Sequence, residues 1–147
     1  MRSNIVLLLI MLSLFTFGCS KTEKNIIEIR ETMFAAQISE IYLNAEDYLG
    51  RTIKLEGIFK IGGNNEEPIF YVLRYAPDDC CGGRGFAGFE VRWSENLPAP
   101  LQYTADDSWV EATGILREHR IGGNKYLYLE LVSLISLDKR GAEYVNR

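Results

Sequence analysis

The residues best suited to chemistry lie between positions 76 and 85, which read Ala-Pro-Asp-Asp-Cys-Cys-Gly-Gly-Arg-Gly. Two adjacent thiols, Cys80 and Cys81, follow two adjacent carboxylates, Asp78 and Asp79. Neighbouring side chains of an extended chain point in opposite directions, so both thiols can reach one ion, or each other, only where the backbone turns. The surrounding proline and glycines permit such a turn. This loop is therefore the first candidate site.

Four outcomes for Cys80 and Cys81 are open from the residues alone. A disulfide between the neighbours is the first hypothesis, because secreted chains meet an oxidising environment. It would close a strained ring and would therefore be comparatively easy to reduce. Zinc binding is the second, with Cys80, Cys81 and Asp79 as ligands and Asp78 or His119 as further donors, at Zn–S distances of about 2.3 Å. The pair lacks the two intervening residues of common zinc motifs. An inter-chain disulfide and an inert buried pair complete the alternatives.

His119 is the single histidine of the chain. Its place near the end of an expected strand favours a surface histidine over a metal ligand or a general base. No serine or cysteine motif accompanies it, which argues against a hydrolase. No glycine-rich loop leads from a strand into a helix, which argues against a phosphate-binding loop. We therefore expect a protein that binds rather than one that catalyses.

The N-terminus resembles a bacterial lipoprotein signal. Arg2 precedes an apolar run, Ile5 to Phe17, which is shorter than the roughly 20 residues that a membrane-spanning helix needs. The end of the run, Phe-Thr-Phe-Gly-Cys-Ser, resembles the lipobox, in which the cysteine is acylated after cleavage. The resemblance implies removal of residues 1–18, lipidation of Cys19, and an extracytoplasmic domain that is lipid-anchored to the bacterial cell membrane. The alternative is an ordinary signal peptide whose cleavage site falls near a cysteine.

The length and composition suit one domain. The full sequence of 147 residues carries 16 basic and 20 acidic side chains and a formal charge of −4, with a composition that excludes disordered tails and disulfide-dense toxins. We expect residues 19–25 to be a polar tether and residues 26–147 to be the folded domain. Nucleic acid is disfavoured as a partner, because neutralisation of phosphates dominates that affinity.

The domain begins with one helix. Residues 26–30 favour a short β-stretch, and then Phe34, Ile38, Ile41 and Tyr42 follow the spacing of one helical face. The pattern predicts a helix over 33–42 that starts at Thr32 as N-cap. A further turn over 45–49, capped by Asn44, ends at Gly50.

From Arg51 onward, alternating apolar and polar residues predict five strands, over residues 51–59, 69–75, 86–93, 109–118 and 125–137. Gly57 and Gly114 interrupt two of them, where a strand would bend. The sequence Ile-Gly-Gly-Asn occurs at 61–64 and again at 121–124, and it predicts a hairpin loop at each place.

Five strands with two hairpins predict a mainly β fold, a five-stranded OB-like Greek-key barrel with an N-terminal helix. An immunoglobulin-like sandwich would need about seven strands. The helix that is usual between the third and fourth strands is missing from 94–107, so the helix over 34–42 is expected to cover the barrel end. Three aromatic residues, Trp109, Tyr126 and Tyr128, could form an exposed stacking surface for a ligand, or they could pack as cross-strand pairs.

A family resemblance adds to these patterns. The run from Asn44 to Gly57, then Tyr75, the Cys80-Cys81 pair, and the run from Trp109 to Gly114 resemble an uncharacterised bacterial domain family over about residues 33–140. That family is the OB-like C-terminal domain of a permease-associated membrane protein of unknown function, and it also occurs in separate lipoproteins. The resemblance implies a membrane permease, or another protein, as a partner.

These observations together predict a membrane-anchored extracytoplasmic binding lipoprotein. The loop at 77–85 and the two Gly-Gly-Asn hairpins would frame a small ligand site, related to a metal or to a permease. The alternatives are a thiol redox module that uses Cys80 and Cys81, and an OB module for protein interaction.

Overall fold

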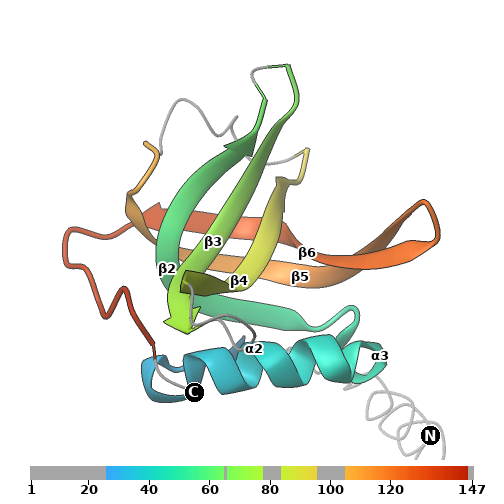
Figure 1. Ribbon diagram of the computed structural model, residues 1–147, viewed down its shortest axis with the longest axis horizontal. Coiled ribbons are helices and arrows are strands. Elements are labelled where there is room, and N and C mark those ends of the chain that lie inside the picture. The colour runs from blue at the N-terminus through green and yellow to red at the C-terminus, as the bar shows by residue number, and fades with distance from the viewer. Residues whose placement is uncertain (1–25, 65, 78–83, 96–104, 146–147) are drawn as a thin grey trace, which may run out of the picture.

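The computed structural model describes residues 26–64, 66–77, 84–95 and 105–145 (Figure 1). The predicted signal segment, residues 1–18, and the tether lie outside this part. Within it the chain is mainly β, with one six-stranded sheet and three short helical segments before the second strand. No helix of the described ranges is both long enough and apolar enough to cross a bilayer.

The helical segments are η1 (Glu31–Met33), α2 (Phe34–Leu43) and α3 (Ala45–Tyr48). The predicted helix is confirmed, and Phe34, Ile38 and Ile41 of its apolar stripe are buried, whereas Tyr42 is exposed. The predicted N-cap is wrong: Met33 precedes α2, Thr32 lies within η1, and no side chain caps α2. Asn44 precedes α3 as expected, yet its amide donates to the Glu40 carboxylate at 2.7 Å instead of capping that helix.

The strands are β1 (Ile27–Glu28), β2 (Thr52–Gly63), β3 (Pro68–Pro77), β4 (Arg84–Trp93), β5 (Trp109–Ile121) and β6 (Asn124–Ser136). The five predicted strands are present, and the short β-stretch at the start adds β1. The order is β1-β2-β3-β4-β6-β5, and β2 also pairs with β5. The β1–β2 and β4–β6 pairs are parallel, and the others are antiparallel.

Strand β2 is shared between two partners. Its first half pairs with β5, from Thr52 opposite Ile115 to Ile58 opposite Trp109, and its second half pairs with β3. Gly57 lies at the change of partner, where a Cβ atom would come within 2.7 Å of the Leu73 carbonyl oxygen. The predicted interruption at Gly57 is therefore a place where two backbones approach closely.

Both predicted hairpins are confirmed. Gly63 ends β2 with φ +77°, opposite Pro68 at the start of β3. Between β5 and β6 the loop is Gly122-Gly123, with φ +56° and +89°. A two-residue loop with both φ angles positive matches the twist of the flanking strands, which is why glycine is suited to it. Figure 1 shows these hairpins projecting in different directions from the sheet.

The core lies between α2 and the strands. In Figure 1 the helix α2 lies along one side of the sheet, next to the place where β3 ends. That it covers the end of a barrel stays a prediction. The helix buries Phe34, Ala35, Ile38 and Ile41 against strand residues that include Ile53, Phe59, Phe89 and Leu129. Alternation on the strands and the helical spacing of α2 therefore meet in one apolar cluster.

The chain after β6 returns to β3. The backbone N–H of Tyr75 donates to the Glu143 carbonyl at 2.8 Å, and the N–H of Val145 donates to the Tyr75 carbonyl at 2.9 Å. Beside it, the buried Arg74 donates to the backbone carbonyls of Glu56 and Ala142. The returning segment thus supplies partners to the part of β3 that extends beyond β2.

Candidate functional site

Most of the predicted site residues lie outside the described ranges. These are Cys19, Asp78, Asp79, Cys80 and Cys81. Pro77 pairs with Arg84, so the segment that holds the cysteines connects two adjacent strand ends. Among the described residues, no three His, Cys, Asp or Glu side chains gather into a group that could hold a metal ion. Zinc at the cysteines stays a prediction.

His119 is half-buried on β5, next to Arg92. Arg92 lies near the C-terminal end of β4, whereas the cysteine segment joins the N-terminal end of that strand at Arg84. The rise of about 3.3 Å per residue separates these two positions by roughly 26 Å. The described strands therefore do not bring His119 to the anchors of the cysteine segment.

The cluster around His119 is made of Glu90, Arg92, Tyr126 and Tyr128, and we call it the Arg92 cluster. Arg92 Nε donates to the Glu90 carboxylate at 2.6 Å, and the guanidinium carbon lies 4.3 Å from the centre of the Tyr128 ring. Arg92 Nη2 lies 3.0 and 3.2 Å from the two ring nitrogens of His119. The imidazole stacks on Tyr126, with ring centres 5.4 Å apart. Three strands thus fix one guanidinium.

The register explains why these residues meet. Glu90 on β4 stands opposite both Tyr71 on β3 and Tyr128 on β6. His119 on β5 stands opposite Tyr126 on β6, two positions from Tyr128 and therefore on the same side of the strand. The row continues to Phe86, whose ring centre lies 6.4 Å from that of Tyr71.

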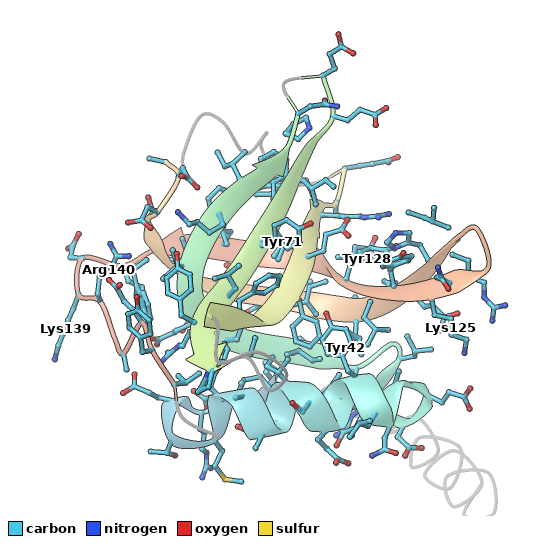
Figure 2. All side chains as sticks on the ribbon, in the orientation of Figure 1. Tyr42, Tyr71, Lys125, Tyr128, Lys139 and Arg140 are labelled. Atoms are coloured by element: carbon cyan, nitrogen blue, oxygen red, sulfur yellow. The ribbon has the colours of Figure 1, made fainter. Side chains whose placement is uncertain are left out.

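Two tyrosine hydroxyls remain protonated beside this row. Burial, followed by the nearby charge of Glu90 and by Tyr71, raises the pKa of Tyr42 to about 12. Burial and Glu90 also raise the pKa of Tyr71. The Tyr42 hydroxyl donates to the Gly88 carbonyl at 3.2 Å, and its ring stacks on Phe89. Figure 2 shows Tyr42, Tyr71 and Tyr128 around β4, each from a different element.

We call Tyr42, Tyr71, Phe86, Tyr126 and Tyr128 the aromatic face. Phe86 is 64% exposed, and Tyr42 and Tyr126 are also exposed. An open pocket of about 470 Å³ adjoins the Arg92 cluster, and its lining includes Glu67, Pro68, Glu90 and Arg92. The arrangement offers flat rings and oriented hydrogen-bond donors, which suits recognition of a ligand better than a chemical step.

Trp109 does not belong to the aromatic face, so its predicted exposure is wrong. Its side chain is only 2% exposed. Alternation directs Trp109 away from Val110, but that side of the strand is covered at this point by Arg74 and by the returning segment around Gly141. Its indole N–H has no hydrogen-bond partner among the described residues. Tyr126 and Tyr128 do lie on the face.

Sequence reasoning missed Tyr71, Phe86, Glu90 and Arg92. The alternation of residues 86–93 placed Glu90 and Arg92 on one side of β4, which was the available signal. Their partners come from β3, β5 and β6, and the parallel β4–β6 pairing is not written in any local pattern.

One family model matches residues 17–147, and it is described as the DUF1980 C-terminal domain. The matched range includes residues 33–140, where the sequence predicted a resemblance to a domain family. A search of curated proteins finds no match.

Proposed function

The chain belongs to the DUF1980 C-terminal domain family, and we propose that it is a binding domain which recognises a saccharide of the cell envelope and does not transform it. The observation that carries the proposal is the aromatic face with the Arg92 cluster beside it. Pyranose rings present flat C–H surfaces that are attracted to the electron-rich faces of aromatic rings. The hydroxyls of Tyr42 and Tyr71 and the Arg92 guanidinium add polar groups at the margin.

The finer form of the fold is part of the proposal. The pairings run from β2 through β3, β4, β6 and β5 and return to β2, which supports a five-stranded OB-like Greek-key barrel. OB barrels bind oligosaccharides and oligonucleotides on one sheet face, between two projecting loops. The formal charge of −4 favours an oligosaccharide over an oligonucleotide as the ligand, because the phosphates of an oligonucleotide would be repelled.

The location completes the proposal. Acylation of Cys19 would anchor the domain to the membrane, on the extracytoplasmic side, and residues 20–25 would let it reach the envelope. The same anchor would hold it near membrane proteins, so docking to a permease through the exposed Phe86 is a second candidate. Exposed aromatic side chains are enriched in protein interfaces as well as in sugar sites.

Calorimetric titration of the full-length protein in detergent tests the proposal. The probes are a neutral galactose trisaccharide, a galacturonate trisaccharide that differs from it only by one terminal galacturonate unit, and a single-stranded oligonucleotide. We expect at least one trisaccharide to bind, and Tyr71→Ala or Tyr128→Ala to weaken its binding about tenfold. Tyr144→Ala is the matched control, because Tyr144 is an exposed tyrosine that packs on Tyr75 away from the aromatic face.

Two results would overturn the proposal. One is that neither trisaccharide binds. The other is that Tyr144→Ala weakens binding as much as the substitutions on the aromatic face. Binding of the oligonucleotide alone would assign the face to nucleic acid instead.

A further inference from the structure

Arg92 is held in one orientation on an exposed surface. Glu90 accepts from Nε at 2.6 Å, Tyr128 lies under the guanidinium at 4.3 Å, and His119 contacts Nη2 at 3.0 Å. The Arg92 side chain is nevertheless 41% exposed. An arginine that is fixed but open to solvent has already lost much of its rotamer freedom before a ligand arrives.

The donors that remain on Arg92 define what it can bind. Arginine has five N–H groups and no acceptor, so a ring nitrogen of His119 accepts from Nη2. With one N–H of Nε and one of Nη2 in use, the two N–H groups of Nη1 and one of Nη2 remain. No described residue accepts from Nη1. Adjacent N–H groups on Nη1 and Nη2 match the two oxygens of a carboxylate.

A flat surface lies next to these donors. Tyr126 stacks on His119, and Tyr128 meets His119 edge-on at 5.5 Å. Tyr126 is exposed, so a ring in the ligand can lie on it while an acidic group of the ligand reaches Arg92. The pocket of about 470 Å³ continues from Arg92 toward Pro68 and can take a neighbouring unit of the ligand.

The balanced local charge accommodates a single carboxylate better than a polyanion. Around the Arg92 cluster, Arg117 pairs with Glu130 at 2.8 Å, and Glu118 receives both Arg120 and Lys125 at 3.3 and 3.5 Å. Lys125 also pairs with Glu46 at 3.6 Å, so together with the Arg92–Glu90 pair four cations balance four anions. A polyphosphate would bring many charges to a chain whose formal charge is −4, whereas one carboxylate adds a single charge to a locally balanced surface.

We propose that the ligand of this face is an acidic saccharide, whose sugar carboxylate is bound by Arg92 while its ring stacks on Tyr126. This inference rests on the proposed function, because it assigns the class of ligand that the same aromatic face binds. Arg92 then acts as the specificity-determining residue: the aromatic rings bind sugars in general, and the oriented guanidinium selects those that carry an acid.

The matched trisaccharides test this preference on the full-length protein. We expect the galacturonate trisaccharide to bind roughly tenfold more tightly than the galactose trisaccharide, as a hydrogen bond to a charged group implies. Arg92→Lys keeps the charge but loses the planar fork, so it should abolish the preference for the galacturonate trisaccharide. Arg140→Lys is the control, because Arg140 is 39% exposed, pairs with Glu143 at 2.9 Å, and lies away from Tyr128 in Figure 2.

A second variant keeps the test independent of the stability of Arg92→Lys. Tyr126→Ala should weaken both trisaccharides about tenfold by removing the stacking surface. N-acetylalanine, a carboxylate without a sugar ring, should compete with the galacturonate trisaccharide at least tenfold more weakly than that trisaccharide itself.

The outcomes separate the inference from the proposed function. Equal affinity for the two trisaccharides, a preference that persists in Arg92→Lys, or equally strong competition by N-acetylalanine would overturn the acidic-saccharide inference while sugar binding stands. Absence of binding by either trisaccharide would remove the proposed function itself, and the inference with it.

Discussion

Arg74 and Glu31 form an ion pair that joins the interior of the protein to its surface. Their Nη1 and Oε2 atoms are 3.0 Å apart, and their side chains are 2% and 52% exposed. The guanidinium also lies between the rings of Phe34 and Trp109, 4.8 Å from each ring centre. Glu31 additionally accepts from the backbone N–H of Ala142, so this pair ties η1 to the returning C-terminal segment.

The stability of the fold should depend on the charge of Glu31 in acid. The hydrogen bond from Arg74, then that from Ala142, lowers the pKa of Glu31 below its ordinary value of 4.5. Above pH 4.5 the Glu31 carboxylate is charged in the folded and the unfolded state, and its contribution to the free energy of unfolding is complete. As the pH falls toward the lowered pKa, the unfolded chain takes up the proton first, so this stabilising contribution is lost. Glu31→Gln should therefore flatten the acid limb of a plot of unfolding free energy against pH.

Denaturant unfolding of both proteins between about pH 6 and pH 3 measures this difference. Glu46→Gln is the control, because Glu46 is exposed and lies 3.6 Å from Lys125 in a surface pair of little expected energy. Parallel curves for the native protein and Glu31→Gln would contradict the assignment.

Gly57→Ala should destabilise the fold by about 1–3 kcal/mol. The added Cβ would lie 2.7 Å from the Leu73 carbonyl oxygen, a backbone atom in the neighbouring strand that cannot move without shifting β3. Gly62→Ala is the matched control on β2, because its Cβ would meet a side-chain atom, Cε2 of Tyr71, at 3.1 Å and not a backbone atom. Chemical denaturation should give a clearly larger loss for Gly57→Ala, and equal losses would contradict the close approach.

Tyr42 should titrate late. Its pKa of about 12 lies above the ordinary 10.0, so between these values the unfolded chain loses the proton while the folded chain keeps it, and the folded state becomes less stable as pH rises. Tyr42→Phe should remove one late step from a phenolate absorbance titration. It should also weaken the alkaline loss of stability. A Tyr42→Phe titration curve that superimposes on that of the native protein would contradict this prediction.

Cys80 and Cys81 should be oxidised to each other in the exported protein. A thiol titration of denatured protein should then detect the pair only after reductant has been added, and metal analysis should find no bound zinc. Free thiols with one zinc per chain, lost on chelation, would instead support a metal site with Asp79. The single variant Cys81→Ser serves as control, because it leaves one thiol that cannot close the ring.

Cys19 should carry the lipid. Mass spectrometry of the mature N-terminus should find a chain that begins at Cys19 with a diacylglycerol adduct, and Cys19→Ser should move the protein from the membrane fraction to the soluble fraction of the envelope. An unmodified N-terminus at another residue would assign an ordinary signal peptide.

Much of the fold was predictable because its signals are local. The two Gly-Gly-Asn loops need positive φ angles, and the structure has them at Gly63, Gly122 and Gly123. Gly57 was recognisable as an interruption in an alternating strand. The stripe of α2 was readable because its spacing repeats within a few residues.

The candidate site was less predictable because it depends on distant pairings. Arg92 meets His119 across three strands, and no spacing in the sequence encodes the β4–β6 register. The predicted exposure of Trp109 was wrong for a related reason. The alternation placed Trp109 on the correct side of β5, but Arg74 and the segment around Gly141 cover that side.

The division of β2 between β3 and β5 governs when the chain can fold. The β2–β3 hairpin can form as soon as both strands exist, but Thr52 must wait for Ile115, which follows much later. Such long-range pairings raise the contact order and slow folding, because the entropy cost of closing a large loop comes before the stabilising contacts form. The sheet of a nascent polypeptide with this topology cannot be completed until β5 has been synthesised.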